Sequence, residues 1–552
     1  MNNGELTNPI IRGSSPDPAI CRRDDEFFIA VSSFQWWPGI PIYHSFDLRY
    51  WTLLCYALTE ERLVNLRRVG DSAGIWAPSL TYADGLFWLV FSPASGSRRR
   101  GYESPNYLTT AQEITGPWSD PVFLNASGND ASLFHDHDGR KYFLNTHQIR
   151  SPEGRHRMEG HAGTLLQEYD PRGHKLVGEA CNIFPGTDAD VPEGSKLYFR
   201  NGWYYLSIAE GGTEYNHCAT LARSRNIRGP YEVHPENPIL TARHDIHNPI
   251  QRAGHADFLT LDDDRVAVVY LASRPVDRMS LCGRETFLTR GRWDDDDWLR
   301  LDRREPQLEI PDFGLKPHPF PARPEMDHFD EATLRLEWNT LRQPSLDRIS
   351  LTERPGWLTL HPNHCLLDSV EAPAAVFQRV GNNAVVAETR LCYRPSQVQQ
   401  WAGLACYYDT RHWYFLYRGF SSVDGPIIGV CGKGVGGCQR MEDLGQVAIE
   451  NVNVVDLRIV CEQRFLKFYF RIRGHGKWRP VGSTEDALIL SDEYVENIDP
   501  VPNFGFTGAF VGLAAWDMTN VGPKPAFDYF EHRAWNGIGR HRGRRIASWS
   551  RR

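Results

Sequence analysis

Residues 17–31 read Asp-Pro-Ala-Ile-Cys-Arg-Arg-Asp-Asp-Glu-Phe-Phe-Ile-Ala-Val, two short apolar segments on either side of a polar turn. The same arrangement returns four more times, and the five copies begin 60, 53, 63 and 62 residues apart. A unit of this length, made of short strands and turns, is typical of a four-stranded sheet, and repeated sheets of this kind close radially into a propeller. The chain is therefore predicted to be all-β and to begin with a five-bladed β-propeller. The copies start at Asp17-Pro-Ala-Ile-Cys, Ala77-Pro-Ser-Leu-Thr, Asp130-Ala-Ser-Leu-Phe, Glu193-Gly-Ser-Lys-Leu and His255-Ala-Asp-Phe-Leu.

In a propeller the innermost strands run along the central axis, so the starts of the five copies are expected to converge on one spot. Three of these starts are carboxylates, Asp17, Asp130 and Glu193, and a fourth is His255. Like charges in one concavity raise the pKa of at least one carboxyl group. Hydrolysis of a glycosidic bond needs such a difference, with one carboxyl protonated and another ionised. A turn-capping role would explain any single carboxylate, but three carboxylates at equivalent positions of the repeat favour a catalytic role.

Aromatic residues accompany the same positions. Phe34, Trp36 and Trp37 follow the first copy, and Trp76 directly precedes the second. Sugar rings expose C–H faces that stack on aromatic side chains. Packing between blades is an equally good explanation for Trp36 and Trp37, so Trp76 is the better candidate for a sugar contact.

The blade pattern stops after Trp298, and a Pro-rich passage over residues 311–324 indicates an extended linker. The predicted organisation is a catalytic propeller over residues 1–310, this linker, and a second domain over residues 325–552. Strand-like runs separated by Gly and Asn in the second domain favour an antiparallel β-sandwich, either a packing partner or a sugar-binding module. A basic tail from about residue 539 is expected to be a solvated terminus.

The composition and net charge of the chain argue against some classes of binding partner. The 552 residues are 41% hydrophobic and carry a net charge of −8, which gives no overall attraction to nucleic acid or to an anionic membrane. The first residues lack a basic region followed by an apolar core, and no apolar run is long enough to span a membrane, so a cytoplasmic protein is expected. The 11 scattered cysteines contain no Cys-x-x-Cys pair, which argues against a zinc site or a disulfide framework.

Short blocks of sequence in both halves of the chain carry a family resemblance. They are Asn8-Pro-Ile, Pro16-Asp-Pro18, Ser32-Ser-Phe, Pro38-Gly-Ile-Pro-Ile-Tyr-His-Ser45, Gly74-Ile-Trp-Ala-Pro78, Pro192-Glu-Gly194, Ala209-Glu-Gly-Gly-Thr-Glu-Tyr215, Gly254-His-Ala-Asp257, Gly283-Arg-Glu-Thr-Phe287, Phe506-Thr-Gly-Ala-Phe-Val-Gly512 and Phe527-Asp-Tyr-Phe530. With these blocks the sequence resembles glycoside hydrolase family 43, in particular its β-xylosidases with a five-bladed propeller and a carboxy-terminal β-sandwich. The resemblance covers nearly the whole chain, and this many blocks in order make it specific.

The resemblance assigns a role to each carboxylate. Asp17 corresponds to the family's general base, Asp130 to the aspartate that modulates the pKa of the acid, and Glu193 to the general acid. Family members of this type invert the anomeric centre in one displacement, so Asp17 would activate water while Glu193 protonates the leaving oxygen.

The resemblance also implies the substrate-binding residues. Those residues are His255, which matches an axial histidine, Arg284, which approaches the sugar and the acid, Phe34 and Trp76 as walls, and Phe506 or Phe510 as the sandwich residue that closes the pocket. The chain departs from the family pattern at Ala131-Ser132, Gly194-Ser195 and Ser14-Ser15. These departures alter the pocket rim and leave open whether the terminal sugar is xylose or arabinofuranose, the two between which the family chiefly divides. One hydroxymethyl rearrangement of the sugar is worth only ~1–3 kcal/mol to a pocket.

The first functional hypothesis is an exo-acting β-xylosidase that removes nonreducing-end xylose from short β-1,4-xylooligosaccharides. The alternative is an α-L-arabinofuranosidase or an enzyme with both activities, and the remoter alternatives are a non-catalytic sugar-binding propeller and a protein-interaction propeller. No cofactor is expected to be required. Some relatives hold a divalent ion near the axial histidine or in the sandwich, and in the sandwich Asp327, Asp330 and Asp528 are the candidate ligands of a structural Ca²⁺. Self-association into a homo-oligomer is a further possibility.

Overall fold

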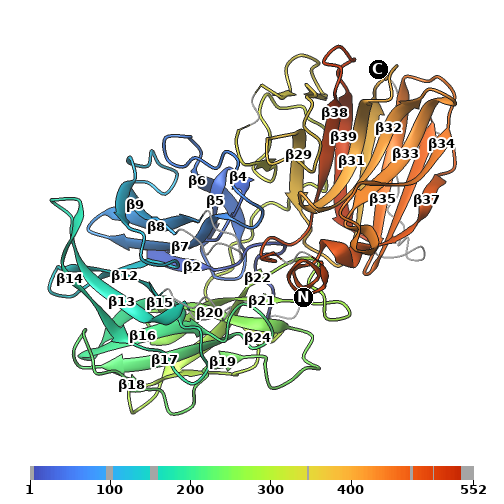
Figure 1. Cartoon of the computed structure of the whole chain (residues 1–552). Helices are drawn as coiled ribbons and strands as arrows, with labels where there is room; N and C mark the ends of the chain where they lie inside the picture. The colour runs from blue at the N-terminus through green and yellow to red at the C-terminus, as the bar shows by residue number, and fades with distance from the viewer. Residues whose placement is uncertain are drawn as a thin grey trace.

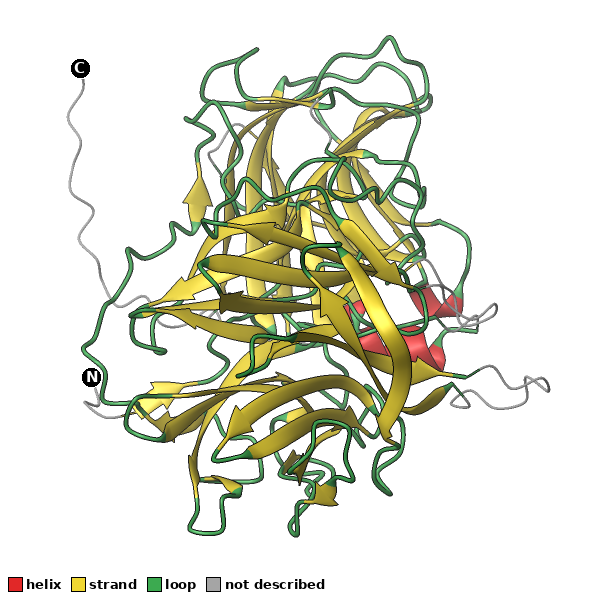
Figure 2. Ribbon diagram, turned by 90° about the vertical axis from the view of Figure 1, so that its left-hand side faces the viewer, coloured by secondary structure: helices red, strands yellow, loops and turns green. Residues whose placement is uncertain are grey.

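The computed structural model confirms an all-β chain in which a propeller precedes a sandwich. Figure 1 shows the blue-to-green propeller beside the orange-to-red sandwich, and in Figure 2 strands account for most of the chain. The structure describes residues 5–94, 104–149, 160–344, 347–472, 476–500 and 503–535, so the basic tail from about residue 539 lies outside the described residues. No helix among these residues is long and apolar enough to cross a membrane.

Five consecutive sheets form the propeller, and each takes its strands in sequence order. Blade one is β2 (Ala19–Arg23), β3 (Glu26–Ala30), β5 (Gly39–Ser45) and β6 (Thr52–Leu58), and blade two is β7 (Gly74–Ala83), β8 (Leu86–Ala94), β9 (Asn106–Ala111) and β10 (Val122–Asn125). Blade three is β11 (Ser132–His135), β12 (Lys141–Gln148), β13 (His161–Asp170) and β14 (Lys175–Phe184). Blade four is β15 (Glu193–Arg200), β16 (Trp203–Glu210), β17 (Cys218–Ser224), β18 (Glu232–Val233) and β19 (Leu240–Thr241), and blade five is β20 (Gln251–Thr260), β21 (Arg265–Ser273), β22 (Glu285–Trp293) and β23 (Leu299–Leu301).

The first strand of each blade lies innermost, because β2 contacts both β7 and β20, while β11 contacts β7 and β15. The N-terminal segment closes the ring alongside blade five. There β1 (Glu5–Thr7) pairs with β24 (Glu309–Pro311), and the Asn8 amide bonds to the backbone of Leu288 in both directions. The beginnings of the repeats therefore do meet around one axis.

The second domain is a sandwich of two antiparallel sheets, joined to the propeller by residues 312–324, which form no regular secondary structure. One sheet contains β25 (Met326–Asp327), β27 (Ile349–Ser350), β28 (Leu358–Leu360), β30 (Ala384–Cys392), β35 (Val454–Glu462), β36 (Phe465–Ile472), β37 (Arg479–Asp486) and β39 (Ala526–Ala534). The other contains β29 (Ala374–Arg379), β31 (Gln400–Asp409), β32 (His412–Ser421), β33 (Gly425–Lys433), β34 (Glu442–Ala448) and β38 (Phe510–Asp517). The short helical turns are η1 (Val435–Gly437), η2 (Ala487–Leu490) and η3 (Tyr494–Ile498).

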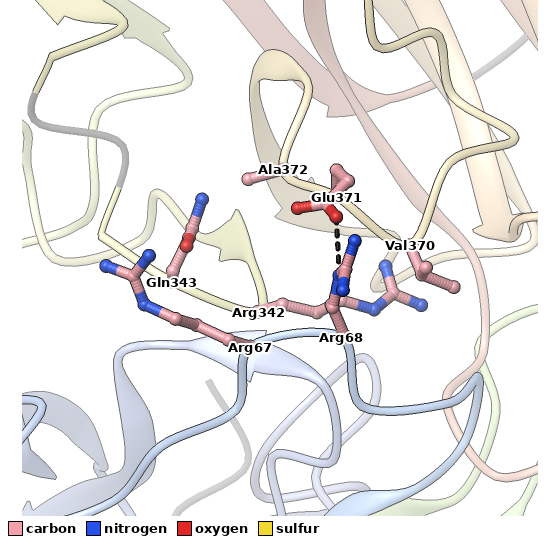
Figure 3. Close-up of a pocket in the computed structure, with 7 residues that line it drawn as sticks. All are labelled: Arg67, Arg68, Arg342, Gln343, Val370, Glu371 and Ala372. Carbon is pink, nitrogen blue, oxygen red and sulfur yellow. Dashed lines mark hydrogen bonds and ion pairs between the residues drawn. The ribbon is translucent and has the colours of Figure 1, made fainter.

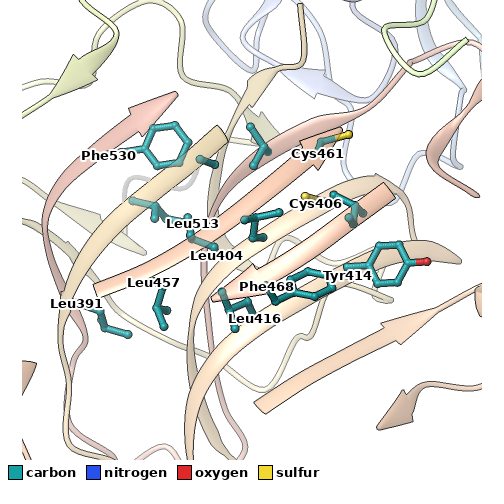
Figure 4. Close-up of a cluster of buried hydrophobic side chains, with 14 of the residues drawn as sticks. Leu391, Leu404, Cys406, Tyr414, Leu416, Leu457, Cys461, Phe468, Leu513 and Phe530 are labelled. Atoms are coloured by element: carbon teal, nitrogen blue, oxygen red, sulfur yellow. The ribbon is translucent and has the colours of Figure 1, made fainter. Parts of the chain in front are cut away.

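Alternating apolar side chains from both sheets fill the sandwich core (Figure 4). Leu391 and Leu457 come from one sheet, Leu404 and Leu416 come from the other, and all four are completely buried. Because alternate side chains of a strand point to opposite faces of the sheet, this alternation places one face of each sheet in the core.

The two domains are joined by more than the linker. The strand β4 (Trp36–Trp37) of the propeller pairs with β26 (Thr340–Leu341) of the sandwich. The buried Arg252 on β20 donates to Asp492 at 2.9 Å and to Glu493 at 3.2 Å, both beside η3. Gly283 and Gly508 approach so closely that a Cβ on Gly283 would lie 2.8 Å from the Cα of Gly508. The loop that precedes β38 is thereby held against blade five.

Candidate active site

The candidate residues on the propeller sit at a backbone distortion that every blade shares. In each blade, an uninterrupted run of pairs between the first two strands begins, or resumes after a register shift, two residues after a residue with positive φ. In four blades this is the residue that starts the sequence repeat: Asp17 (φ 55°), Ala77 (φ 32°), Asp130 (φ 54°) and His255 (φ 49°). In blade four it is Gly194 (φ 60°). The pairs that open these runs are Ala19 with Ala30, Ser79 with Val90, Ser132 with Leu144, Lys196 with Ser207 and Asp257 with Val269.

The sequence alignment of blade four was therefore wrong by one residue: Glu193 precedes the position equivalent to Asp17. The physical reason lies in Gly194, because a Cβ there would sit 2.5 Å from Nε2 of His255. Only glycine combines the left-handed backbone with space for the imidazole. Glu193 still opens β15 at the axis, so the shift leaves the carboxylate within the site.

Asp257 fixes the innermost strands of blades one, four and five relative to one another. Its Oδ2 accepts from the Ile20 amide at 2.9 Å and from Lys196 Nζ at 2.7 Å, and its Oδ1 accepts from the Tyr198 hydroxyl at 2.6 Å. Ile20 and Lys196 each lie three residues beyond a candidate carboxylate, Asp17 and Glu193, so the buried Asp257 carboxylate fixes the spacing of the strands that carry them.

Asp17 is buried and surrounded by positive charge and donors. His255 Nδ1 lies 3.3 Å and Arg284 Nη1 lies 3.5 Å from its Oδ1, while the Ser32 hydroxyl donates to its Oδ2 at 2.5 Å. Burial alone would raise the pKa of Asp17, but Arg284, His255 and Ser32 together hold it well below its usual range. Asp17 is therefore an ionised carboxylate.

Glu193 and Asp130 have the opposite electrostatics. Burial, and then repulsion from Asp17, raises the pKa of Glu193 to about 7, although Arg284 opposes the rise. Burial, and then repulsion from Glu193, raises the pKa of Asp130 to about 7. Both carboxyls keep their protons below neutral pH while Asp17 has lost its own, so one site holds both a proton donor and a base.

Residues that sequence reasoning missed complete the carboxylate site. His161 Nε2 lies 3.6 Å from Glu193, and burial lowers the pKa of His161 to about 4. His217 packs against Gly254, and burial lowers its pKa to about 3, so both histidines are neutral at pH 7. Asn129 hydrogen-bonds to both Asp130 and Glu193. None of these three side chains is the first residue of a sequence repeat. Only the position of Asn129, directly before Asp130, could have indicated from the sequence that it belongs to the site.

An aromatic cluster borders the carboxylates and includes the sandwich. Phe506 lies 5.9 Å from Phe34 and 5.6 Å from Trp76 between ring centroids, and the guanidinium of Arg284 lies 4.9 Å above the Phe506 ring. Phe504, which the sequence did not single out, stacks on Phe506 at 4.9 Å. The structure thus brings Phe34, Trp76, Arg284 and Phe506 together.

Phe510 does not join this cluster, and its expected pocket contact is wrong. Its ring stacks on Trp36 at 3.6 Å and is 1% exposed, within a core that Trp36 shares with sandwich strands. Phe510 begins β38 and points into the interface between the domains, whereas Phe506 lies in the preceding loop.

The three carboxylates considered for calcium do not gather. Asp327 accepts from the Trp338 indole at 2.8 Å and lies 3.5 Å from Arg335, and Asp528 pairs with Arg390 at 3.3 Å. Asp330 is exposed. Among the described residues no group of three or more His, Cys, Asp or Glu side chains could hold a metal ion.

A cavity of about 180 Å³ between the domains lies apart from this chemistry (Figure 3). None of its lining residues is a candidate residue, and its positive charges are neutralised. Arg68 donates to Glu371 at 2.5 Å, and Arg342 donates to Asp71 at 2.7 Å. We therefore assign it no catalytic role.

Comparisons with known proteins agree with this geometry. A family model described as "Glycosyl hydrolases family 43" matches residues 6–299, and one described as "Beta xylosidase C-terminal Concanavalin A-like domain" matches residues 326–533. The chain is 39% identical to a xylosidase/arabinosidase of Humicola insolens, over 96% of this chain and 98% of that protein. It is 37% identical to a xylan 1,3-β-xylosidase of a Vibrio species, over 96% and 99% of the two chains. A crystal structure of a xylan β-1,4-xylosidase from Bacillus halodurans has a TM-score of 0.90 at 37% identity, and covers 96% of this chain and 100% of that one.

Proposed function

Because the chain belongs to glycoside hydrolase family 43, we propose that it is an exo-acting β-xylosidase that removes nonreducing-end xylose from short β-1,4-xylooligosaccharides with inversion. The observation that carries the proposal is the electrostatic difference between two buried carboxyls of one site. The pKa of Asp17 lies well below its usual range, and that of Glu193 is about 7. A single displacement needs this pair in these protonation states.

Asp17 acts as the general base. It takes a proton from a water molecule whose oxygen forms a bond to the anomeric carbon, on the face opposite to the leaving group. Glu193 gives its proton to the glycosidic oxygen as the bond from that oxygen to the anomeric carbon breaks. The products are xylose of inverted configuration and a shortened chain, and proton exchange with water restores both carboxyls.

Asp130, His255 and Arg284 support these two steps. The charge of Arg284, with a hydrogen bond from His255, keeps Asp17 ionised. Asp130 repels Glu193 when both are ionised, so its carboxyl favours the protonated acid. Asp130 is the modulator in this scheme and does not touch the bond that is broken.

The aromatic cluster is the basis for action at a chain end. Phe506 of the sandwich lies against Phe34 and Trp76 of the propeller and is 8% exposed. A pocket wall supplied by a second domain blocks one end of the sugar site, so a terminal sugar fits and the interior of a polymer does not.

One alternative has a specific observation behind it: the Humicola insolens relative carries a name that covers both xylosidase and arabinosidase activity. An α-L-arabinofuranosidase or bifunctional enzyme is therefore the second candidate. The names of the two other relatives also specify different linkages, β-1,3 and β-1,4.

The test is a side-by-side assay with an aryl β-xyloside, an aryl α-L-arabinofuranoside, and xylobioses of β-1,4 and β-1,3 linkage. We expect the β-xyloside and β-1,4-xylobiose to be cleaved best, and proton NMR of the first product to show the α-anomer of xylose. Asp17→Asn should lower turnover by several powers of ten, and Asp295→Asn, at an exposed loop position, is the matched control. Initial release of the β-anomer contradicts inversion, and faster cleavage of the arabinofuranoside favours the second candidate.

The cytoplasmic location, the possible homo-oligomer and the possible structural Ca²⁺ stay predictions. Sedimentation and metal analysis of the purified protein address the last two.

A further inference from the structure

Asn129 is a buried residue that acts on both Glu193 and Asp130. It directly precedes Asp130, is 3% exposed, and its backbone carbonyl accepts from the Thr146 amide at 3.1 Å. Its side-chain Oδ1 accepts from Gln148 Nε2 at 2.9 Å. Gln148 ends β12, the strand paired with β11, so the donor comes from the same blade.

This contact fixes which way the Asn129 amide faces. Gln148 offers its NH₂ group to Oδ1, so the Nδ2 group of Asn129 points the other way. The same side chain also interacts with Asp130 and Glu193, and this interaction lowers the pKa of both carboxyls. Its two N–H groups are the right number for two carboxyls.

We propose that Asn129, oriented by Gln148, is a positioning residue that holds the carboxyls of Glu193 and Asp130 together and sets the pH above which the acid loses its proton. The inference rests on the acid role proposed above for Glu193. Asn129 does not contact the sugar in this scheme and acts only through the two carboxyls.

The direction of its effect follows from hydrogen bonding. An N–H donor stabilises a carboxylate more than a carboxylic acid, so Asn129 lowers the pKa of both groups. Burial, with repulsion from Asp17 on Glu193 and from Glu193 on Asp130, raises the same pKa values to about 7. Asn129 thus limits a rise that would otherwise be larger. The other titratable or charged groups that face the two carboxyls are Asp17, His161, His255 and Arg284.

Two variants test the inference by changing different residues, Asn129 and its orienting partner Gln148. Asn129→Ala removes the donors, and Gln148→Glu replaces the orienting donor by a carboxylate that only accepts. Asn129 then turns its NH₂ group towards the new carboxylate and its oxygen towards Asp130 and Glu193, which favours their protonated forms. Both variants should move the alkaline limb of kcat/KM upwards by roughly one pH unit, the size expected for a hydrogen bond to a charged group.

Gln148→Met is the matched control, because it removes the donor without reversing the amide or adding charge. It should shift the limb less than Gln148→Glu does. Since Gln148 is only partly buried, its variants remain informative if Asn129→Ala does not fold. If the alkaline limb of kcat/KM lies at the wild-type pH in every folded variant, the inference is wrong.

A second readout does not depend on turnover. Difference infrared spectra of wild type and Glu193→Gln isolate the carboxyl band of Glu193, and its titration should move upwards in the Gln148→Glu background. If no glycoside is cleaved, the proposed function fails while this titration still tests Asn129. If glycosides are cleaved and the band titrates unchanged, only the positioning role fails.

Discussion

Replacing Phe506 by Ala should weaken both the fold and the binding of xylobiose, whereas Phe510→Ala should weaken the fold alone. The Phe506 ring is 8% exposed and contacts rings of both domains, and the Phe510 ring is 1% exposed in the interface core. Removal of a buried Phe side chain costs ~3–5 kcal/mol of unfolding free energy. Both variants should therefore unfold at lower denaturant concentration by comparable amounts.

The binding effect separates the two variants. Loss of one aromatic stacking contact with a sugar is worth about 0.5–1.5 kcal/mol, by analogy with aromatic pairs. That free energy corresponds to a rise of roughly two- to twelvefold in KM for xylobiose. The Arg284 guanidinium, 4.9 Å above the ring, also loses its support. The Phe510 side chain makes neither the sugar contact nor the Arg284 contact, so Phe510→Ala should keep the wild-type KM for xylobiose.

The assays are urea unfolding followed by fluorescence, and initial rates with xylobiose under conditions where each variant is fully folded. Equal stability losses with an unchanged KM in both variants would refute the reasoning and assign Phe506 to the interface core.

Four further outcomes are expected. Asp17→Asn should lower kcat by ~10²–10⁴-fold with little change in KM, because it removes a positioned base, and retention of a tenth of the activity contradicts that role. Glu193→Ala should slow xylobiose far more than an activated aryl xyloside, whose leaving group needs little protonation, and equal losses on both substrates would make Glu193 structural. Asp130→Asn removes a carboxylate that repels Glu193, so the alkaline limb of kcat/KM should move to lower pH, and unchanged limbs exclude modulation. The pKa of Glu193 is raised in the folded state, so its contribution to stability is complete below pH 4 and is lost as the pH rises through about 7. Glu193→Gln, which cannot ionise, should therefore exceed the wild type in unfolding free energy by about 3 kcal/mol at pH 8, with no difference near pH 4.

The repeat was visible in the sequence because each blade must present one apolar inner strand and one apolar neighbour, whatever its loops contain. The one-residue error in blade four arose because Glu193 and Gly194 both suit the start of a strand. The deciding constraint, the ring of His255 against Gly194, comes from another blade.

Other contacts were hidden for the same reason. His161 approaches Glu193 from β13, and Gln148 reaches Asn129 from β12. The strand pairing that brings these residues together leaves no pattern in the neighbouring sequence. Phe506 and Phe510 stand four residues apart in similar surroundings, so composition could not separate a loop residue from the first residue of β38. The calcium candidates followed from relatives that hold a divalent ion and from the oxygen atoms of three carboxylates. In the structure Trp338, Arg335 and Arg390 occupy two of these carboxylates.

The close approach of Gly283 and Gly508 has a consequence for how chain-end selectivity can change. Gly508 lies two residues after Phe506, and Gly283 lies directly before Arg284, so the contact between these two glycines sets how far the sandwich ring reaches over the propeller. A methyl group on either glycine would meet backbone atoms at 2.8 Å and hold the domains apart. The far end of the sugar site would then open to longer chains with every catalytic side chain still present. On this reasoning, a change from trimming to internal cleavage would begin at two positions that have no side chain, and it would require no new catalytic group.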